Sequence, residues 1–462
     1  MQHGIQHIHF LGICGTAMGS VAAALQERGF TVTGSDENVY PPMSTFLEKK
    51  GVKLTAGYRA ANLPADAQLI VIGNAMKRGN PEVEAVLNRK LYYLSLPETL
   101  KEFFLRGRHN LVVTGTHGKT TTTSLLTWIL ETAGLEPSYL IGGIPKNLGQ
   151  GARFRDSAHV VLEGDEYDTA FFDKRSKFVH YMPELVIVNN IEFDHADIFD
   201  DLDAIKLSFR RMLNIVPGNG MALLNADDPN CLDVGRTCPA PTLTVGFSPD
   251  AAHRIEAASY PAGGGAEFTL SGTRFHLRLS GEYNVRNAAM AITAARFYGI
   301  PLPVIQKAVA SFEGVLRRQE IRGEVRGIKI IDDFGHHPTA IRQTLAGLRH
   351  QYPGARLWAI FEPRSNTTRR AVFQHQLPGA FAGADGVVFS KVARLEQIPE
   401  GERLKPEQVI ADIAATGKPA FYEPGADQII ARLRPLVQSG DIIAVFSNGG
   451  FDGIHARLLK EL

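Results

Sequence analysis

Short apolar runs alternate with longer stretches of helical periodicity over most of the chain. Strands and helices that follow one another in this way are typical of an α/β fold built on parallel sheets. The apolar runs fall into three groups, which begin with "IHFLG", "HNLVVTG" and "IKIIDDF". We therefore predict an α/β protein of three domains, with boundaries at 1–106, 107–316 and 317–462.

Each of the three sections has its own set of expected elements. In the first, "IHFLG", "FTVTGSD" and "LIVIGN" are predicted strands, and a helix is expected near "NPEVEAVLNRK". The second has strands in "HVVLEGD" and "ELVIVNN" and a helix at "YNVRNAAMAITAARFYG", whereas 240–282 has the glycine-rich turns of short β segments. The third repeats the α/β pattern with "IKIIDDF", "RLWAIFE", "GVVFS" and "DIIAVFS".

The bulk composition is that of an ordinary globular protein and excludes several other classes. The 462 residues suggest about three domains at roughly 150 residues each. A net charge of +1 gives no reason to expect nucleic-acid binding, and no apolar run has the length of a membrane span. The N-terminus lacks the pattern of a signal peptide. Three cysteines without a CxxC pair favour neither disulfides nor a zinc site, so the expected location is a reducing cytoplasm.

The first glycine loop, "GICGTAMG", follows a predicted strand and precedes a helix of small residues. Its glycines, Gly12, Gly15 and Gly19, are spaced GxxGxxxG, and Cys14 stands where the dinucleotide fingerprint GxGxxG has its second glycine. Asp36 ends the next strand, where that fingerprint has its acid. Three interpretations are open: the nicotinamide site of a dehydrogenase, a purely structural turn, and a nucleotide held by its pyrophosphate. The altered spacing favours the last of these.

The second glycine loop, "VVTGTHGKTTTT", is the most informative segment of the chain. An apolar strand leads into Gly118, Lys119 and Thr120 and then into a helix. Val113 stands at the first glycine position of the phosphate-loop pattern GxxxxGK[ST], so the match is imperfect. Amides in such a turn bind phosphate oxygens, the lysine reaches the β- and γ-phosphates, and the threonine ligates Mg²⁺. The alternative is a simple glycine turn with a solvated lysine.

Acidic side chains follow the next two predicted strands. They are Glu163, Asp165, Glu166 and Asp168 in "VVLEGDEYD", and Glu192, Asp194 and Asp197 in "VIVNNIEFDHAD", where they accompany Asn190 and His195. Carboxylates at strand ends beside a phosphate loop hold Mg²⁺ in phosphoryl-transfer sites. One histidine among such oxygen ligands is compatible with this cation. Any single acid here could instead cap a helix or solvate a loop.

Polar residues also follow strands of the third section. They are Asp332, Asp333, His336 and His337 in "IIDDFGHHPTAI", and Arg364, Arg369 and Arg370 in "FEPRSNTTRR". Pro338 marks the expected start of a helix. Closely spaced arginines suit the binding of carboxylates or phosphates. The alternative is a solvated helix start, although cations there oppose the helix dipole.

The segments "GTHGKTTT", "EGDEYD", "NNIEFDH", "GEYNVRNAAMA" and "DDFGHHP" occur in the order found in the Mur ligases, and the chain resembles that family over essentially its whole length. The resemblance implies a Rossmann-like N-terminal domain that binds the UDP part of a substrate. It implies a central P-loop ATPase-type α/β domain with a small β subregion, and a Rossmann-like C-terminal domain that binds the incoming amino compound. The implied activity is ATP-dependent formation of a carbon–nitrogen bond through an acyl phosphate, with ATP and Mg²⁺ as cofactors.

Other segments resemble the branch of the family that recycles cell-wall peptides: "GICGTAMG", "ENVYPPMS", "DTAFFDKRSKFVHY" and "EPRSNTTRR". This resemblance implies a cytoplasmic ligase, monomeric or weakly dimeric, that joins L-alanyl-γ-D-glutamyl-meso-diaminopimelate to UDP-N-acetylmuramate. The alternative within the family adds free L-alanine to the same acceptor. A ligase resembling folylpolyglutamate synthase and a non-catalytic protein gated by nucleotide are more distant alternatives.

The resemblance also implies a role for each candidate residue. ATP would be bound by Gly115, Thr116, His117, Gly118, Lys119, Thr120, Thr121, Asn287, Arg318 and Asp333. The UDP-sugar would be bound by Gly12, Cys14, Gly15, Ser35 and Asp36, and the peptide by His337, Arg364 and Arg369. The metal ligands would be Thr120, Glu163 and His195, and the catalytic residues Lys119, His195 and His336. Either of these two histidines is a candidate general base.

One element of several family members is missing from this chain. Their carbamylated lysine, which bridges a second Mg²⁺, would fall near Phe209, and Lys206 is off register. The L-alanine branch also lacks this lysine. Because the expected ATP and peptide sites lie in different sections, we also predict that the third domain swings onto the second.

Overall fold

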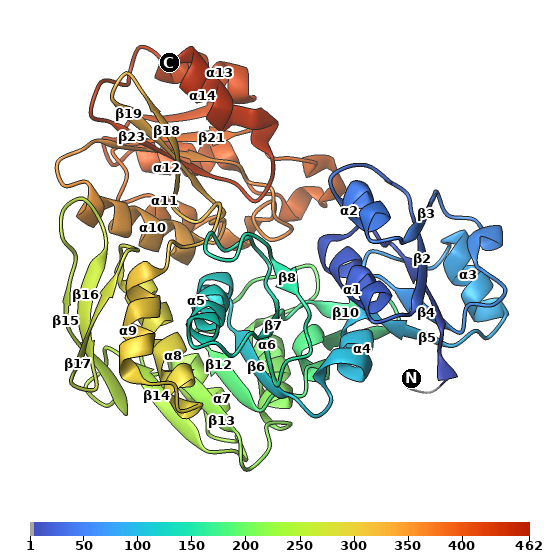
Figure 1. Ribbon diagram of the computed structural model, residues 1–462. Coiled ribbons are helices and arrows are strands. Elements are labelled where there is room, and N and C mark those ends of the chain that lie inside the picture. The colour runs from blue at the N-terminus through green and yellow to red at the C-terminus, as the bar shows by residue number, and fades with distance from the viewer. Residues whose placement is uncertain (1–3) are drawn as a thin grey trace.

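The computed structural model describes residues 4–462, so residues 1–3 of the predicted first domain lie outside the described residues. Figure 1 shows three α/β units, each built around its own sheet. The N-terminal unit (blue) lies beside the central unit (green to yellow), and the C-terminal unit (orange to red) lies over one end of the central unit. The predicted α/β class is therefore confirmed.

The N-terminal unit is a five-stranded parallel sheet with the order β3-β2-β1-β4-β5. Its strands are β1 (His7–Leu11), β2 (Thr31–Asp36), β3 (Lys53–Ala56), β4 (Leu69–Ile72) and β5 (Tyr93–Ser95). Its helices are α1 (Thr16–Glu27), α2 (Met43–Lys49), α3 (Pro81–Asn88) and α4 (Leu96–Leu100), followed by a π-helical turn at Lys101–Leu105. The strand order reverses between β1 and β4, and ligands of α/β sheets bind beyond the carboxyl ends of strands at such a point. The first glycine loop lies there, directly after β1.

The central unit is a ten-stranded sheet with the order β17-β16-β15-β14-β13-β12-β6-β9-β7-β8. Its strands are β6 (His109–Thr114), β7 (Ser138–Leu140), β8 (Ala152–Arg153), β9 (His159–Glu163), β12 (Leu185–Val188), β13 (Met221–Asn225), β14 (Thr242–Gly246), β15 (His253–Ser259), β16 (Ala266–Leu270) and β17 (Thr273–Leu277). The strands from β14 to β7 are parallel, whereas β15, β16 and β17 pair antiparallel. These last strands are the short β segments predicted for 240–282.

The helices of the central unit are α5 (Lys119–Thr132), α6 (Leu202–Leu213), α7 (Pro229–Gly235), α8 (Glu282–Phe297) and α9 (Leu302–Ser311). Apolar side chains of α5, α8 and α9 share one core with side chains from one face of the sheet, from β6, β9 and β12 through to β17. α5 begins at the end of the glycine loop and α8 packs against it, so these two helices bring the loop and Asn287 together.

A two-stranded hairpin of the central unit, β10 (Asp168–Ala170) and β11 (Asp173–Ser176), packs against the N-terminal unit. At its tip, Phe171 and Phe172 pack against the apolar core of the N-terminal unit. The rings of Phe172 and Tyr93 meet edge to face with their centres 5.0 Å apart. The segment "DTAFFD" thus has a packing role that its sequence alone did not reveal.

The C-terminal unit is a six-stranded sheet with the order β18-β19-β23-β20-β21-β22. Its strands are β18 (Glu320–Val325), β19 (Ile328–Asp333), β20 (Leu357–Phe361), β21 (Gly386–Ser390), β22 (Ala420–Glu423) and β23 (Ile442–Phe446). Its helices are α10 (Pro338–Gln351), α11 (Leu377–Ala380), α12 (Pro406–Ala414), α13 (Ala426–Leu433) and α14 (Ile454–Glu461). Only β18 runs antiparallel to its neighbour among the strands described in this unit. Within residues 4–462, no helix has the length and apolar character needed to cross a bilayer.

Candidate active site

The glycine loop between β6 and α5 is shaped by two glycines that no larger residue fits. Gly115 and Gly118 have φ angles of +123° and +79°. A Cβ on Gly118 would lie 2.5 Å from Asn287 Oδ1, and one on Gly115 would lie 2.9 Å from the Asn190 backbone nitrogen. The Asn190 side chain closes the loop, because it accepts the His117 amide at 2.7 Å and donates to the His117 carbonyl at 3.1 Å. The loop leads directly into the N-terminus of α5. Backbone amides at the N-terminus of a helix commonly bind phosphate.

The Lys119 ammonium group lies under this loop in a buried ion pair. It donates to the Gly115 carbonyl at 2.7 Å and to the two carboxylate oxygens of Glu166 at 2.9 and 2.8 Å. Burial opposes charge on both partners, but their mutual attraction outweighs it, so the pKa of Lys119 is raised and that of Glu166 is lowered. Both groups therefore stay charged, and a bound phosphate would compete with Glu166 for the ammonium group.

Thr120 and Glu163 form an oxygen-rich pair at the start of α5 and the end of β9. The Thr120 hydroxyl donates to Glu163 Oε1 at 2.9 Å, and the Gly142 amide donates to Oε2 at 2.7 Å. Burial raises the pKa of Glu163 against these hydrogen bonds. Hydroxyl and carboxylate oxygens are the ligands that Mg²⁺ prefers, and a cation would offset the cost of burying this carboxylate. The residues present therefore fit a magnesium ion at this position.

His195 contacts the Glu166 carboxylate, which also binds Lys119. Its Nε2 lies 2.9 Å from Glu166 Oε1, and its backbone has a left-handed φ of +57° that is held by a hydrogen bond from its amide to Asp194 Oδ1. Burial lowers the pKa of His195, but the hydrogen bond to Glu166 outweighs it and the pKa is raised. Ligand atoms of Asp165, Glu166 and His195 lie within 4.8 Å of one another. A cation that includes His195 would thus be shared with these two acids.

The C-terminal unit closes the side of the site opposite the glycine loop, and its Asp333 lies at the end of β19. The Asp333 carboxylate accepts the Gln319 amide at 2.9 Å and the Gly335 amide at 2.7 Å, and burial raises its pKa. The Arg318 guanidinium group lies over the Phe334 ring, 5.0 Å from its centre. These contacts place one carboxylate and one guanidinium group opposite the glycine loop.

Asn287 and Tyr283 line the same space from α8. Asn287 is buried, and its Nδ2 has no hydrogen-bond partner among the described residues. The Tyr283 hydroxyl accepts a hydrogen bond from Gln319 Nε2 at 2.6 Å, which joins α8 to the C-terminal unit. A buried amide donor without a partner is costly unless a ligand satisfies it. An adenine ring nitrogen would supply the missing acceptor.

Hydrogen bonds join the central and C-terminal units along the edge of the site. The Thr367 hydroxyl donates to Asp194 Oδ1 at 2.7 Å, and Asn366 Nδ2 donates to Asp197 Oδ2 at 2.7 Å. Burial works to raise the pKa of Asp194, but the nearby side chains of His336 and His195 hold it well below its usual value. The two units are therefore in contact in this structure.

The result is a cavity of about 230 Å³ between the central and C-terminal units. Most of the predicted nucleotide, metal and catalytic residues line it: Thr116, His117, Gly118, Lys119, Thr120, Thr121, Glu163, His195, Asn287, Arg318, Asp333 and His336, together with His337 from the predicted peptide set. Gly115 belongs to the glycine loop but does not line the cavity, and its carbonyl accepts a hydrogen bond from the Lys119 ammonium group. Residues far apart in the chain thus meet at one site.

The two predicted peptide arginines lie outside the cavity lining and differ from each other. Arg364 is part-exposed, with Nη1 3.5 Å from Glu362 Oε1. Arg369 is buried, and its guanidinium group donates to Asn366 Oδ1 at 2.7 Å and, at 3.3 Å, to Gln397 Oε1. The peptide-binding role of both arginines stays a prediction; in this structure the Arg369 side chain holds the loop together.

The first glycine loop forms a separate site on the N-terminal unit. Gly12 has a φ of +81°, and its amide donates to the Ser35 carbonyl at 2.9 Å. Asp36 accepts the Cys14 amide at 2.9 Å, and burial and this carboxylate raise the pKa of the Cys14 thiol to about 11. The Ser35 hydroxyl is fully buried and donates to Glu82, so this side chain supports the loop, and its contact with the UDP-sugar stays a prediction. Gly15 precedes α1, and the α1 N-terminus remains available to an anion.

Several residues of the site were not assigned a role from the sequence. Glu166 was noted only as one of several acids after a strand, yet it links Lys119 to His195. Tyr283 lies in the segment "GEYNVRNAAMA" but is assigned no role there, and Gln319 lies in none of the family motifs. The packing of α8 against the C-terminal unit brings these two side chains together. The missing carbamylated lysine is explained by local packing. Phe209 is fully buried, and Lys206 pairs with Asp233 at 2.6 Å.

A phosphate loop, an oxygen-rich pair of side chains that fits a cation, and a cavity closed by a third unit define an ATP-dependent ligase of the Mur type. Three family descriptions match in chain order: "Mur ligase family, catalytic domain" at 7–108, "Mur ligase middle domain" at 113–295, and "Mur ligase, glutamate ligase domain" at 317–449. The chain belongs to the Mur ligase family.

Three similar proteins illustrate this membership. UDP-N-acetylmuramate–L-alanyl-γ-D-glutamyl-meso-2,6-diaminoheptandioate ligase of Escherichia coli K12 is 45% identical over 460 residues, covering 98% of each chain. The crystal structure of a murein peptide ligase from Psychrobacter arcticus matches with a TM-score of 0.71 and 38% identity, over 99% of this chain and 98% of that one. UDP-N-acetylmuramate–L-alanine ligase of Syntrophus aciditrophicus is 31% identical over 468 residues, covering 100% of this chain and 95% of the relative.

Proposed function

We propose that this protein joins L-alanyl-γ-D-glutamyl-meso-diaminopimelate to UDP-N-acetylmuramate with consumption of ATP, in the recycling of cell-wall peptides. The observation that carries the proposal is the cavity in which Lys119, Glu163 and Asn287 of the central unit face Arg318 and Asp333 of the C-terminal unit. The E. coli relative named for this reaction supports the choice of substrates, because its match covers nearly the whole chain.

In the first step, a carboxylate oxygen of the muramate attacks the γ-phosphorus of ATP. The bond from that phosphorus to the β,γ-bridging oxygen breaks, so that ADP leaves and an acyl phosphate forms. The Lys119 ammonium group, released from Glu166, neutralises phosphate charge, and the loop amides orient the oxygens. Thr120 and Glu163 would hold Mg²⁺, which supplies further charge neutralisation when bound. Asn287 would bind adenine, and Arg318 and Asp333 would close on the nucleotide.

In the second step, the peptide amine attacks the acyl carbon, loses a proton, and phosphate leaves. His195 and His336 are both candidates for the base. His195 Nε2 already contacts Glu166 Oε1 at 2.9 Å. His336 is the better candidate, because a ring proton on Nδ1, which faces the Phe334 carbonyl at 3.2 Å, leaves the lone pair on Nε2. Arg364 and His337 remain proposed contacts for the peptide, and positioning supplies most of the rate enhancement.

The substrate is tested by phosphate release with ATP, Mg²⁺ and UDP-N-acetylmuramate. We expect turnover with the tripeptide and at least about tenfold lower kcat/KM with free L-alanine, because the larger acceptor offers more contacts whose binding energy is used in the transition state. Equal or faster turnover with L-alanine would favour the L-alanine ligase, the second candidate supported by the Syntrophus relative.

A ligase is distinguished from a non-catalytic nucleotide-gated protein by Lys119→Ala. We expect this variant to lose at least about 100-fold in turnover, because a charge that stabilises the transferred phosphoryl group is removed. Lys174→Ala is the matched control, since Lys174 forms an exposed ion pair with Asp168 and should leave turnover unchanged. Wild-type protein that binds nucleotide but releases no phosphate with either acceptor would overturn the proposal.

The division of labour among the three units is part of the same proposal. Residues 1–106 would bind the UDP-sugar through Gly12, Gly15, Cys14 and Asp36, 107–316 would bind ATP, and 317–462 would bind the peptide. The three free cysteines support a cytoplasmic location, where thiols stay reduced. We propose a monomer or weak homodimer, which sedimentation at several concentrations would measure.

A further inference from the structure

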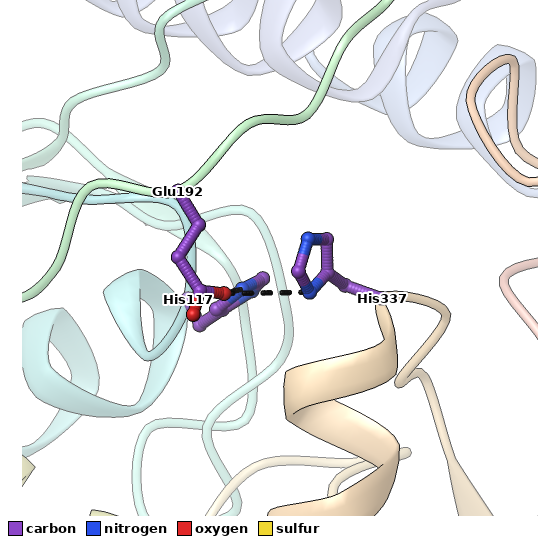
Figure 2. A group of neighbouring side chains, drawn as sticks. All are labelled: His117, Glu192 and His337. Carbon is purple, nitrogen blue, oxygen red and sulfur yellow. Dashed lines mark hydrogen bonds and ion pairs between the residues drawn. The ribbon is translucent and has the colours of Figure 1, made fainter. Parts of the chain in front are cut away.

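His117, Glu192 and His337 meet where the C-terminal unit rests on the central unit (Figure 2). His117 comes from the glycine loop, Glu192 follows β12, and His337 is the residue before α10. His117 Nε2 lies 2.8 Å from Glu192 Oε2, and His337 Nδ1 lies 3.4 Å from the same oxygen. One carboxylate oxygen thus faces imidazole nitrogens from two different units.

The hydrogen bonds around this group already orient its members. His337 Nε2 lies 3.2 Å from the Phe193 carbonyl, which can only accept, so the ring proton is on Nε2. Nδ1 therefore carries the lone pair. It accepts the Thr339 amide at 3.2 Å, a hydrogen bond that a metal ion bound at Nδ1 would replace. The Thr339 hydroxyl donates to Glu192 Oε1 at 3.0 Å, which leaves Oε2 directed at the two histidines. Histidine ligands of metals commonly donate their other N–H to a carbonyl in this way.

The group is also shielded from water. The side chains of His117 and His337 are only 13% and 4% exposed, and the Glu192 side chain is 35% exposed. Ligand atoms of all three residues lie within 4.8 Å of one another. Imidazole nitrogens and carboxylate oxygens that converge at a shielded position are typical of a site for a divalent metal.

We propose that His117, Glu192 and His337 bind a zinc-like divalent cation that links the C-terminal unit to the glycine loop. Two imidazole nitrogens and one carboxylate oxygen are typical zinc ligands, whereas Mg²⁺ prefers oxygen alone. Tetrahedral ligands at the usual zinc distances lie about 3.3 Å apart, close to the separations of 2.8 and 3.4 Å observed here. Both histidines line the cavity, so a fourth position is open to water or a substrate oxygen.

This site is separate from the proposed magnesium ligands Thr120 and Glu163, and it does not depend on the proposed substrates. Because its ligands come from both units, a bound ion would hold the closed arrangement. Among residues 4–462, two other groups bring a histidine and two acids within 4.8 Å: Asp165, Glu166 and His195, and Glu98, Asp173 and His180. These groups provide matched controls.

The test is calorimetric titration of the full-length protein with Zn²⁺ alone in the presence of excess Mg²⁺, with Co²⁺ absorption as a second readout of ligand geometry. We expect one Zn²⁺ per chain in the wild type, and an affinity lower by about 100-fold or more in His337→Gln and Glu192→Gln. His195→Gln, His180→Gln and the exposed control His375→Gln should retain wild-type affinity. The wild type and its binding-competent controls should show the intense visible absorption of tetrahedral Co²⁺.

Three results would overturn the proposal. They are absence of Zn²⁺ binding by the wild type, loss of binding in His195→Gln or His180→Gln, and unchanged affinity in Glu192→Gln. Far-ultraviolet circular dichroism checks that each variant folds. Glu192→Gln keeps the size of the side chain and one acceptor oxygen, which can serve either Thr339 or His117, so it carries the test if His337→Gln proves unstable.

Discussion

His9 is a histidine inside the buried strand β1, with its Nδ1 2.8 Å from the Thr33 hydroxyl. Burial and the charge of the neighbouring His7 lower its pKa from 6.5 to about 4. Between these values the unfolded chain binds a proton at His9 that the folded chain does not bind. Stability therefore rises with pH through this window and falls as the pH drops from 6.5 to 4.

Replacement of His9 should remove this contribution to the pH dependence. From pH 6.5 to 4 we expect the wild type to lose up to about 3 kcal/mol more stability than His9→Gln. The measurement is urea unfolding at several pH values, followed by circular dichroism. Thr33→Val, which keeps the titrating group, should retain the steeper pH dependence. Parallel curves for the wild type and His9→Gln would contradict the assignment.

The sequence located many of the chemically active residues because they belong to ordered motifs. Thr120 and Glu163 lie in such motifs and meet as predicted, with 2.9 Å between their oxygens. Ser35 and Arg369 lie in motifs too, but their side chains turn inward towards partners from elsewhere in the chain. Side-chain direction depends on those tertiary neighbours, and one sequence does not specify them.

At the scale of the elements, the loop before α5 needs a glycine at position 118 because of its backbone conformation. Gly118→Ala combines a φ of +79° with a Cβ 2.5 Å from Asn287 Oδ1, a proposed adenine ligand. We expect ligase turnover to fall by about 100-fold or more, because strain and a displaced Asn287 both disturb the nucleotide site. Steady-state phosphate release measures the effect.

Gly134→Ala is the matched control for this prediction. Gly134 ends α5 with a similar φ of +76°, but a Cβ there meets nothing within 4 Å. It should cost about 1 kcal/mol of stability and leave turnover unchanged. Equal losses of activity in both variants would show that backbone strain alone, without the contact to Asn287, explains the effect.

The strands and helices of the parallel regions could be predicted from apolar runs and their spacing. β18 could not, because "EIRGEV" mixes polar and apolar positions, and it becomes an edge strand only by pairing antiparallel with β19. The hairpin of β10 and β11 was also not predicted. Its two phenylalanines are stabilised by the core of another unit rather than by local periodicity.

At the scale of the whole molecule, the cavity is smaller than a nucleotide triphosphate site needs. Its volume is about 230 Å³, whereas sites for small ligands commonly measure about 300–1,000 Å³. We therefore expect the C-terminal unit to move away from the central unit when ATP enters and then to close again. The contacts from Thr367 to Asp194 and from Asn366 to Asp197 would break during opening.

Small-angle X-ray scattering should detect this movement. We expect the scattering curve to change when an unreactive ATP analogue and UDP-N-acetylmuramate are both added, because bound ligands shift the balance between open and closed arrangements. Thr367→Val, which removes the hydrogen bond to Asp194, should shift the free protein towards the open arrangement. Identical curves with and without ligands would contradict domain closure.

The position of β23 has a consequence for synthesis of the chain. This strand is the last of the described strands in sequence, yet it lies between β19 and β20 and pairs with both. On a growing polypeptide, the glycine loop and the proposed magnesium ligands can fold first, while the C-terminal sheet lacks its middle strand until residues 442–446 have emerged. A ribosome that stalls before this point would leave a phosphate-binding unit whose cover cannot form.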